Sequence, residues 1–502
     1  MQIKKIVIAG GGTAGWMSAA GLCQLLKPLG LEICLVESEQ IGTVGVGEAT
    51  LPHMRFFNRT LGLDERELMA ATNATFKLGI EFRDWAQIGD SYIHPFGDYG
   101  PPGQTIPFHH VWHRLKEEGR SGRIDDFSLP VRMSERGKFG FPSDDPESLL
   151  STFSYAYQLD ASLYAKYLRR FSEANGVKRI EGRITSVERD GESGHISALN
   201  LESGERVEGD FFIDCTGFRA MLMGKELGAT FIDWSHWLPC DRAIAVACEK
   251  TGESLPYTRA TARGAGWQWR IPLQHRTGNG HVYASEFMDD QTAEDILLSS
   301  LDADAITEPN RLRFKAGMQD RQWIGNCIAV GLSSGFLEPL ESTSIYLIQA
   351  GITAFAELMP SGGIDQRDVD EFNRVMQLEY DRIRDFLVLH YHATERDDSP
   401  FWTYVRTMSI PDTLKEKMDL FKSRGVVQEY KDGLFLHPSW IAVYLGQRVM
   451  PETRDPRADA LSDAEILKLM KETEEIERLL DGCPAHETAL TDFCRKEAPV
   501  FS

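Results

Sequence analysis

The stretch Gly10-Gly11-Gly12-Thr13-Ala14-Gly15 joins an apolar run at residues 3–9 to a segment with helical apolar spacing at residues 13–26. The apolar run predicts a β-strand, and residues 31–37 predict a second strand that ends in Glu37. Glycines at this spacing allow a tight turn and let backbone N–H groups approach a pyrophosphate at the start of a helix. Glu37 follows Gly15 by 22 residues, where a carboxylate can hold ribose hydroxyl groups. This strand–turn–helix–strand unit predicts a dinucleotide-binding fold.

The composition narrows the class of protein further. The chain has 502 residues, which predicts two domains or one domain with large insertions. Its net charge of -21 argues against a nucleic-acid partner, because binding to phosphates needs a basic surface. No apolar run approaches the ~20 residues of a membrane span, and the first apolar residues form a strand rather than a signal peptide. The eight cysteines contain no C-x-x-C pair, so we expect a reduced cytoplasmic protein without a structural metal.

The rest of the chain predicts strands in the middle and helices in the last third. Residues 91–145 are rich in glycine, proline, histidine and aromatic residues, which indicates an irregular insertion. Residues 155–175 predict a helix, and residues 177–214 predict short strands, followed by a β-rich region that extends to Phe287. Further helices are predicted at 343–359, 368–392 and 462–480, the last opening with the capping box Ser462-x-x-Glu465.

Two later segments favour FAD over NAD as the dinucleotide. Residues 210–217, Asp-Phe-Phe-Ile-Asp-Cys-Thr-Gly, resemble the Thr-Gly run of glutathione-reductase-type flavoproteins. Residues 326–331, Asn-Cys-Ile-Ala-Val-Gly, resemble their third motif, in which a strand delivers a glycine to the flavin side. Hydroxylases usually continue this motif with Gly-Asp, whereas Leu332 follows Gly331 here, which weakens a simple monooxygenase interpretation. Since the sequence has no second G-x-G-x-x-G motif for NADPH, we expect a separate reductase to supply reduced flavin.

These motifs together predict an α/β fold with three parts. The parts are a glutathione-reductase-type, Rossmann-like FAD-binding module, an inserted β-sheet region on the substrate side, and a helical C-terminal substrate subdomain. The predicted boundaries are 1–90, 150–225 and 310–360 for the FAD-binding module, 91–149 and 226–309 for the inserted region, and 361–502 for the helical subdomain.

Five runs of sequence, in family order between residue 10 and about residue 350, resemble the flavin-dependent tryptophan halogenase family. They are Gly10-Gly-Gly-Thr-Ala-Gly-Trp16, Val44-Gly-Val-Gly-Glu-Ala-Thr50, Asn73-Ala-Thr-Phe-Lys77, Trp267-x-Trp269-x-Ile271-Pro272 and Glu338-Pro-Leu-Glu-Ser-Thr343. The resemblance implies a two-component, FADH2-dependent enzyme in which reduced FAD, O2 and chloride or bromide yield hypohalous acid. That oxidant then halogenates an organic substrate beside a lysine.

Within this resemblance, Lys77 and Glu341 match the two catalytic residues of the family. The ammonium group of Lys77 can hydrogen-bond hypohalous acid, or its neutral amine can attack the acid to form a haloamine. Glu341 can orient the hypohalous acid and accept the proton lost from the substrate ring. The ordinary alternatives are a solvated surface lysine and an acid in the first turn of the helix at 343–359.

The resemblance also implies contacts to the cofactor and the halide. Residues 42–50 resemble the family's mobile strap, which contacts the flavin and leads towards the lysine. The N–H groups of Thr343 and Ser344 at a helix start suit a halide. The family commonly has glycine at the position of Ser344, so the preference between chloride and bromide stays open. The predicted FAD-binding residues are Gly10, Gly12, Thr13, Ala14, Gly15, Glu37, Gly47, Glu48, Ala49, Ile184, Gly217, Gly331 and Leu332.

Aromatic side chains are predicted to wall the substrate. Trp267 and Trp269 alternate along one strand and therefore share a face, where they can separate the substrate from the flavin. His94 and Phe96 match the pair that stacks on the substrate's indole in family members. In both cases the ordinary alternative is a pair of buried core aromatics. Ser342 completes the predicted substrate-binding residues.

We expect the substrate to be indole-like rather than free tryptophan. The family's C-terminal lid, which grips the amino-acid end of tryptophan, is not evident in the sequence. Residues 430–450 instead offer Tyr430, His437, Trp440 and Tyr444 in a different arrangement. The run Glu-Ser-Thr-Ser at 341–344 is similar to a branch of the family that accepts free indole and bromide. No metal is expected at His109-His110-x-x-His113, because no matching carboxylates or cysteines accompany it.

The halogenase is the leading of three functions. The second is a flavin monooxygenase that hydroxylates an aromatic substrate, which predicts a Gly-Asp third motif and no Lys77/Glu341 pair. The sequence departs from both of these expectations. The third is a flavin-binding sensor or scaffold without turnover, against which the presence of both residues argues. The sequence leaves the oligomeric state, monomer or homodimer, open.

Overall fold

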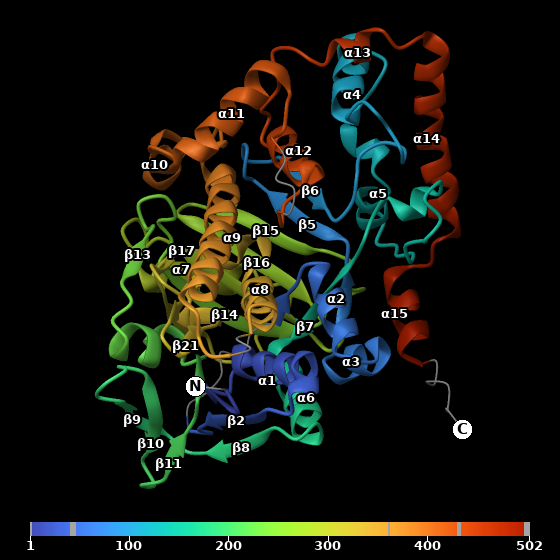
Figure 1. The fold of residues 1–502 in the computed structure, drawn as a ribbon. Helices are drawn as coiled ribbons and strands as arrows, with labels where there is room; N and C mark the ends of the chain where they lie inside the picture. The colour runs from blue at the N-terminus through green and yellow to red at the C-terminus, as the bar shows by residue number, and fades with distance from the viewer. Residues whose placement is uncertain (1–2, 41–46, 360–361, 429–432, 496–502) are drawn as a thin grey trace. The chain divides into compact units, whose positions relative to one another are not determined.

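The computed structural model describes residues 3–40, 47–359, 362–428 and 433–495, and Figure 1 shows them as a ribbon. The chain divides into two compact units, each built from three stretches of sequence. Unit 1 comprises residues 1–73, 159–241 and 313–381, and unit 2 comprises residues 74–158, 242–312 and 382–502. None of the helices that the structure describes is long and apolar enough to cross a membrane.

Unit 1 is built on a six-stranded sheet. In spatial order its strands are β20 (Trp323–Ile324), β21 (Cys327–Ala329), β12 (Phe211–Asp214), β1 (Lys5–Ala9), β2 (Glu32–Glu37) and β8 (Lys178–Glu181). All neighbours pair in parallel except β20, which is antiparallel to β21. The residues of β1 are buried on both faces of the sheet from Ile6 to Ala9, as expected for a central parallel strand. This sheet confirms the predicted Rossmann-like α/β fold.

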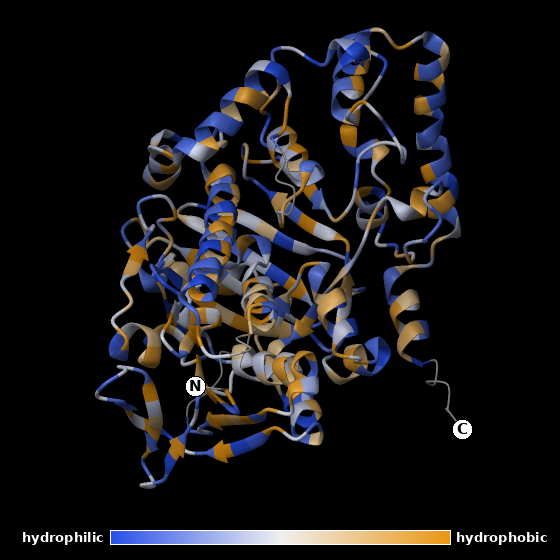
Figure 2. Cartoon of the chain, in the orientation of Figure 1, coloured by the Kyte–Doolittle hydropathy of each residue, from blue (hydrophilic) through white to orange (hydrophobic). Residues whose placement is uncertain are grey.

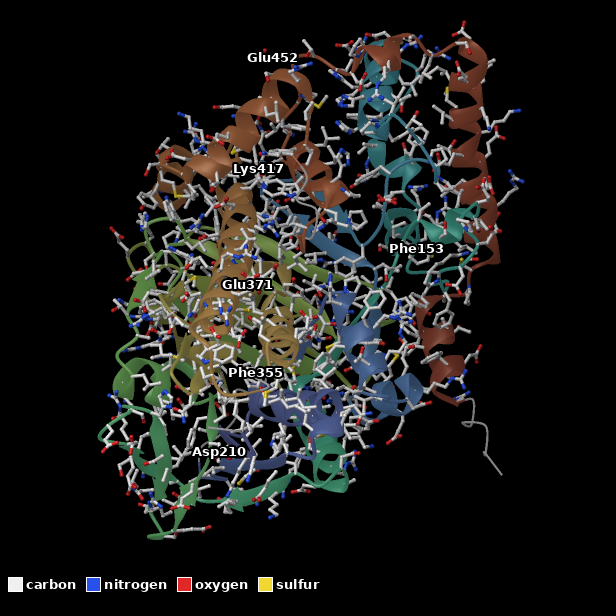
Figure 3. All side chains as sticks on the ribbon, in the orientation of Figure 1. Phe153, Asp210, Phe355, Glu371, Lys417 and Glu452 are labelled. Atoms are coloured by element: carbon white, nitrogen blue, oxygen red, sulfur yellow. The ribbon has the colours of Figure 1, made fainter. Side chains whose placement is uncertain are left out.

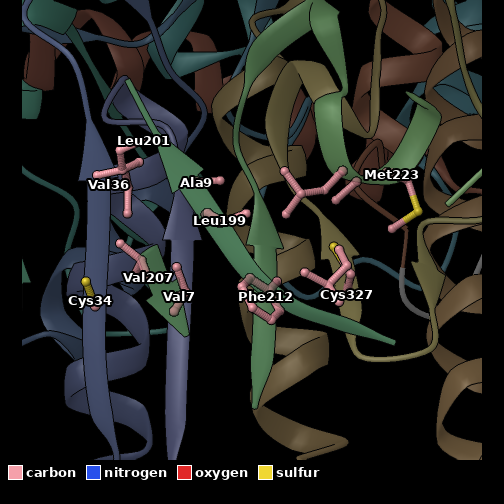
Figure 4. Packing of buried hydrophobic residues seen from close by; sticks show 13 residues of the cluster. Val7, Ala9, Cys34, Val36, Leu199, Leu201, Val207, Phe212, Met223 and Cys327 are labelled. Carbon is pink, nitrogen blue, oxygen red and sulfur yellow. The ribbon is translucent and has the colours of Figure 1, made fainter. Parts of the chain in front are cut away.

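A small antiparallel sheet packs on one face of the parallel sheet. Its strands are β9 (Ile184–Arg189), β10 (Ile196–Leu201) and β11 (Arg206–Glu208). Figure 4 shows Val7 and Val36 of the parallel sheet in one cluster with Leu199, Leu201 and Val207 of the small sheet. These side chains are at most 3% exposed, so the cluster forms the apolar core on that side.

Helices of unit 1 gather around α1 (Thr13–Leu25), which follows the glycine turn. Both α6 (Ala161–Ala174) and α8 (Ser344–Glu357) contact α1. Phe355 of α8, labelled in Figure 3, stacks on Phe211 of β12 with ring centroids 4.7 Å apart, which fixes α8 to the sheet. The remaining elements of unit 1 are β3 (Gly47–Ala49), α2 (His53–Thr60), α3 (Glu65–Ala71), β13 (Phe231–Asp233), β19 (Gly317–Gln319), β22 (Gly335–Phe336) and the first part of α9 (Gln366–His392).

The predicted helix at 155–175 is wrong in its first part. Residues 156–160 form strand β7 (Ala156–Asp160), all of whose residues are buried, and α6 begins after it. Within unit 2, β7 pairs antiparallel with β4 (Thr75–Lys77), a partner that lies far away in the sequence. Asp160 then caps α6, because its Oδ1 accepts two N–H groups of the helix's first turn. Local apolar spacing cannot reveal such a distant strand partner.

Unit 2 is built on a seven-stranded sheet. In spatial order its strands are β18 (Asn310–Arg313), β14 (Arg242–Glu249), β17 (Arg276–Tyr283), β16 (Gly266–Pro272), β15 (Thr258–Arg263), β5 (Gly79–Arg83) and β6 (Ser91–Pro95). The run from β14 to β15 is antiparallel, and so is the pair of β5 and β6. The parallel pairing of β15 with β5 joins these two groups into one sheet, although they are far apart in sequence.

The region at 91–145 is not the irregular insertion that its composition predicts. It contains β6, α4 (Phe108–Glu117) and α5 (Leu129–Glu135). The buried face of α4 includes His109, His110 and His113, so a pattern of apolar residues alone does not reveal this helix. The remaining helices of unit 2 are α7 (Asp290–Ser299), the last part of α9, α10 (Pro400–Thr407), α11 (Asp412–Arg424), α12 (His437–Gly446), α13 (Pro456–Asp459), α14 (Asp463–Gly482) and α15 (His486–Arg495).

The two units differ from the predicted domains at several boundaries. Residues 79–83 lie in the predicted FAD-binding module, but the pairing of β5 with β6 and β15 makes them part of unit 2. The predicted C-terminal subdomain is separate and starts at residue 361, whereas residues 382–502 belong to the same unit as the inserted sheet. The contact of α12 with β6 ties the C-terminal helices to that sheet.

A buried carboxyl group lies on α14. Figure 2 shows hydrophobic and hydrophilic residues interleaved along this helix, which opens with the predicted capping box of Ser462 and Glu465. Glu472 is only 6% exposed, and its Oε2 has no hydrogen-bond partner among the residues that the structure describes. Burial, and then the neighbouring Glu475, raise the pKa of Glu472 to about 9. The carboxyl group is therefore protonated in the folded protein at neutral pH.

Glu472→Gln is expected to stabilise the protein near neutral pH. Because the folded-state pKa of Glu472 is raised from 4.5, the stability that its neutral form contributes is complete below pH 4.5 and is lost as the pH rises towards 9. Glutamine stays neutral, so the variant should gain about 1 to 3 kcal/mol at about pH 8 and little at about pH 4.5. Thermal unfolding at both pH values measures the gain. The control is Glu474→Gln at an exposed neighbouring position, which should change stability little. An equal gain in Glu472→Gln at both pH values would show that the raised pKa of Glu472 is not the cause.

Candidate active site

The glycine turn of unit 1 is packed tightly at its ends and open in its middle. Gly10 has φ +112°, and a Cβ there would lie 2.2 Å from the carbonyl oxygen of Cys215. A Cβ on Gly15 would lie 1.8 Å from the carbonyl oxygen of Gly10. A Cβ on Gly12 would meet no described atom within 4 Å, and Gly12 precedes α1, whose first turn has no side-chain cap. A helix start that is open and uncapped fits a pyrophosphate.

The carboxylate of Glu37 lies against this turn, as the sequence predicts. A Cβ on Gly11 would fall 1.6 Å from Oε2 of Glu37. The indole N–H of Trp16 donates to the same oxygen at 3.2 Å, and Arg179 and Arg169 pair with Oε1. A carboxylate accepts several hydrogen bonds, so these partners leave capacity for ribose hydroxyl groups.

The two later FAD motifs, residues 210–217 and 326–331, meet the glycine turn within unit 1. Asp214 ends β12 and is fully buried; its Oδ1 accepts the N–H and the hydroxyl of Thr216, and its Oδ2 accepts the N–H groups of residues 222 and 223. Gly331 has φ +71°, and a Cβ there would lie 2.7 Å from Cβ of Ala14. The structuring role of Asp214 was not predicted, although an acid that ends a buried strand before Thr-Gly was its signal.

Other predicted cofactor residues lie at the edges of this region. Glu48 is in β3, and burial raises its pKa to about 7. Leu332 is in a short turn directly after Gly331. Ile184 begins β9 and packs against the apolar cluster of unit 1. Residues 41–46 lie outside the described residues, so the predicted strap is described only from Gly47 onward, and its contact with the flavin stays a prediction.

The predicted halide site lies before α8 in unit 1. Glu341 ends a short turn and is fully buried, so it is not a first-turn acid of α8. Ser342 follows with φ +59°, a left-handed conformation that a serine adopts at a cost of ~1 kcal/mol. Thr343 precedes the helix, whose start at Ser344 has no side-chain cap. The buried Oγ1 of Thr343 has no hydrogen-bond partner in the part of the chain that the structure describes. These donors at a helix start can hold an anion.

In unit 2, the structure brings Lys77 and Phe96 together. Lys77 ends β4 and is fully buried, which excludes the surface-lysine alternative. Its Nζ lies 5.0 Å from the ring centroid of Phe96. The backbone N–H of Phe96 donates to the carbonyl of Leu78 at 2.8 Å, which fixes the ring next to the lysine. His94 meets Phe96 edge to face, with centroids 6.3 Å apart.

The two tryptophans of β16 lie on one face, as predicted. Trp267 and Trp269 are 1% and 7% exposed, and their ring centroids lie 6.2 Å apart. Gly280 of β17 stands opposite Trp269, and a Cβ there would lie 2.0 Å from the indole. Both indole N–H groups have no hydrogen-bond partner among the described residues. Their burial fits a cavity wall and fits core packing, so the role as a wall stays a prediction.

Unit 2 also holds a buried lysine that was not predicted. Lys417 of α11, labelled in Figure 3, is 3% exposed, and its Nζ lies 4.1 Å from the ring centroid of Trp440. Burial lowers the pKa of Lys417 to about 8. A lysine at irregular spacing on an amphipathic helix gives no signal of burial in the sequence. Lys417 therefore provides a second buried lysine above an aromatic ring, against which Lys77 can be compared.

The remaining residues of the predicted C-terminal region lie in the packing of unit 2. The indole N–H of Trp440 donates to the carbonyl of Phe435 at 3.2 Å, and Tyr444 stacks on Phe421. Tyr430 lies outside the described residues. His437 contacts His109, and burial lowers the pKa of His109 well below its usual value. Among the described residues, no group of His, Cys, Asp and Glu side chains is arranged to hold a metal ion.

The parallel sheet, its glycine turn and the converging Gly331 define unit 1 as an FAD-binding module of the Rossmann-like type. The chain belongs to the tryptophan halogenase family, because the family model described as tryptophan halogenase matches residues 5–463. The family resemblance predicted from five short motifs is therefore confirmed.

Individual relatives agree with this membership. The chain is 35% identical over 510 aligned residues to tryptophan 6-halogenase ThaL of Streptomyces albogriseolus, with 93% of this chain and 94% of that protein covered. The solved structure of Xcc4156, a flavin-dependent halogenase from Xanthomonas campestris, is 47% identical with a TM-score of 0.95, covering 99% of this chain and 100% of that one. That of BrvH, a flavin-dependent halogenase from Brevundimonas sp. BAL3, is 44% identical with a TM-score of 0.94, covering 98% and 99%.

The chain is thus a flavin-dependent halogenase, as predicted. Membership of this family implies FAD, O2 and a halide as reactants, a separate flavin reductase, and a small-molecule substrate. The glycine turn and the uncapped start of α1 fit the dinucleotide, which connects the family assignment to residues of this chain. The comparisons support a halogenase rather than the two alternatives, a flavin monooxygenase and a flavin-binding sensor without turnover.

Proposed function

We propose that this halogenase holds FAD at the glycine turn and Glu37, binds a halide at Thr343 and Ser344, and uses Lys77 and Glu341 to halogenate an indole-like aromatic. FAD held there would supply, in its reduced form, the electrons that activate O2, and O2 would be the oxidant that converts the halide to hypohalous acid. The overall transfer exchanges a ring C–H bond for a carbon–halogen bond, and the hydroxyl group of hypohalous acid leaves as water with the proton from the ring.

The observation that carries this proposal is the complete burial of Lys77 beside an aromatic ring. Removing an ammonium group from water costs several kcal/mol, so a fully buried lysine is an uncommon feature, and burial in an apolar site favours its neutral, nucleophilic form. Lys77 can donate a hydrogen bond to the oxygen of hypohalous acid and thereby make the halogen more electrophilic. Alternatively, its neutral amine can exchange with the acid to form an N–halogen bond and water.

The ring carbon of the substrate then attacks the halogen. The positive charge that develops on the ring is discharged when a base removes the proton from the same carbon, and the carboxylate of Glu341 is our candidate for that base. Phe96 and His94 offer flat surfaces beside Lys77 on which an electron-rich ring can pack. In this proposal, Trp267, Trp269 and Ser342 are further candidates for contacts with the substrate.

A reconstituted assay tests the proposal. Purified protein is combined with a flavin reductase, NADH, FAD and either bromide or chloride, and is offered free indole and free tryptophan in parallel. We expect mass spectrometry to detect halogenated indole, with much less halogenated tryptophan. A hydroxylated product would instead support the monooxygenase, and preferred halogenation of tryptophan would refute the indole-like substrate. The ratio of bromination to chlorination measures the halide preference.

A further inference from the structure

One face of the seven-stranded sheet in unit 2 carries a group of arginines, Arg83, Arg259, Arg263 and Arg270, called here the arginine face. Arg259 stands opposite Arg270 on β16, and Thr261 stands opposite Arg83 on β5. Because side chains of paired residues project to the same side and alternate along each strand, the four guanidinium groups share one face. Trp267 and Trp269 alternate with Gln268 and Arg270, so the two indoles project from the other face.

A cavity of about 260 Å³ lies over the arginine face. All four arginines line it, together with Gln268 of β16 and Ser300, which follows α7. The cavity lies within unit 2, and none of its lining residues belongs to the proposed FAD or halide sites. Trp269 is the one lining residue that is also a proposed substrate residue. It is far larger than a single halide ion and has room for a small organic or inorganic oxyanion.

The guanidinium groups are only partly neutralised. Arg83 and Arg259 share the single carboxylate of Glu81, with Nε–O distances of 2.9 and 2.7 Å. Arg270 pairs with Asp302. Arg263 has no ion-pair partner in the described ranges, and its closest acceptor is an amide.

The surroundings of Arg263 keep the positive charge in excess. Asp84 lines the cavity and interacts electrostatically with Arg263, whereas the nearby positive charge of Arg396 is paired with Asp398. Burial, together with Arg396, lowers the pKa of Arg263 despite Asp84, but a guanidinium group stays protonated at neutral pH. The carboxylates of Glu81, Asp84 and Asp302 therefore face four guanidinium groups. The cavity is cationic in a chain whose net charge is -21.

Two buried donors in the cavity also lack acceptors. Gln268 is 6% exposed, and its Oε1 accepts from Nε of Arg263 and from the hydroxyl of Ser300, both at 2.9 Å. Since Nε of Arg263 can only donate, this atom is assigned as the oxygen and the other amide atom as the NH2 group. That Nε2 has no hydrogen-bond partner among the described residues, and neither has Nε of Arg270. These unsatisfied donors lie among guanidinium groups that carboxylates neutralise only in part, which favours an anion in the cavity.

We propose that this cavity is a binding site for a small oxyanion, a molecule with a phosphate or carboxylate group, separate from the halide and flavin sites. Two oxygens of one phosphate or carboxylate match the fork of Arg263, and the other three guanidinium groups line the same cavity. The site requires no turnover and does not depend on the proposed roles of Lys77 and Glu341.

Calorimetry and thermal unfolding of the FAD-saturated protein test the proposal. Inorganic phosphate and citrate are titrated separately, at an ionic strength held constant with chloride, so that flavin-site binding and general salt effects are excluded. Saturable binding of phosphate alone identifies phosphorylated ligands, binding of citrate alone identifies carboxylates, and binding of both identifies a general oxyanion site. The absence of saturable binding by either probe would overturn the proposal.

Variants locate the binding. Arg263→Gln should raise the dissociation constant at least about tenfold, because it removes the one guanidinium group without a carboxylate partner and leaves no acid unpaired. Arg263→Lys keeps the charge but loses the fork, so it should bind with intermediate affinity. Arg424→Gln, an exposed arginine of α11, is the control and should bind like the parent protein. Unchanged affinity in Arg263→Gln, or in Arg263→Lys if the first variant fails to fold, would place the anion elsewhere.

Discussion

Lys77→Met is expected to reduce halogenation by at least about a thousandfold while the protein stays folded and binds FAD. Methionine has a similar length and no charge, so it fills the buried space beside Phe96 without a cavity. The variant loses the donor that would position hypohalous acid next to one ring carbon. Flavin chemistry in unit 1 has no need of this side chain, so consumption of NADH and O2 should continue.

The fate of the oxidant distinguishes loss of positioning from loss of flavin chemistry. In Lys77→Met, hypohalous acid should escape and halogenate a soluble scavenger in proportion to the O2 consumed. Halogenated indole at the parent rate would refute the role of Lys77, and so would the loss of both indole and scavenger products. Glu341→Gln should lower the rate by about a hundredfold, because the ring proton then leaves to water.

Lys417→Met provides the matched control for Lys77→Met. Both lysines are buried in unit 2 with Nζ above an aromatic ring, but Lys417 faces Trp440 rather than Phe96. Asp385, the acid near Lys417, retains its ion pair with Arg384, so the control leaves no isolated charge. The control should keep the parent halogenation rate. Equal losses in both variants would mean that burial of any lysine in unit 2 matters, not chemistry at Lys77.

Sequence patterns predicted the parts of this fold that depend on neighbours in the chain. The glycine turn, β1, β2 and the acid at Glu37 follow from local spacing, since a parallel strand buried on both faces is a continuous apolar run. Strand β7 was not predicted, because its partner β4 lies far away in the sequence and the residues of β7 also suit a helix. Helix α4 was not predicted, because its buried face includes histidines.

The same distinction applies to the candidate site. Lys77 and Glu341 could be predicted because short flanking motifs resemble a known family, whereas Gly280 could not. Its absent side chain makes room for Trp269, and that need arises only when β16 and β17 pair. The arginine face has a similar origin, since the pairing of β15 with β5 brings Arg83 to the three arginines of the hairpin formed by β15 and β16. Residues that act through strand pairing leave no local pattern for a sequence analysis to find.

Gly12→Ala is expected to weaken FAD binding at least about tenfold without destabilising the protein that lacks FAD. A Cβ on Gly12 meets no described atom within 4 Å, and its φ of -73° suits any residue. The methyl group would therefore cost the protein little. If the pyrophosphate lies against the start of α1, the methyl group occupies the space of the cofactor and separates it from the backbone N–H groups.

Gly10→Ala and Gly191→Ala make this prediction specific. Alanine at Gly10 would clash with the carbonyl oxygen of Cys215 and would need φ +112°, so this variant should lose both stability and FAD binding. Gly191 lies in a surface turn with no atom within 4 Å of its Cβ position, so its variant should lose neither. Thermal unfolding and FAD titration of the three variants give three distinct outcomes. If Gly12→Ala binds FAD like the parent protein, the cofactor does not lie at the start of α1, because the methyl group would otherwise occupy its space.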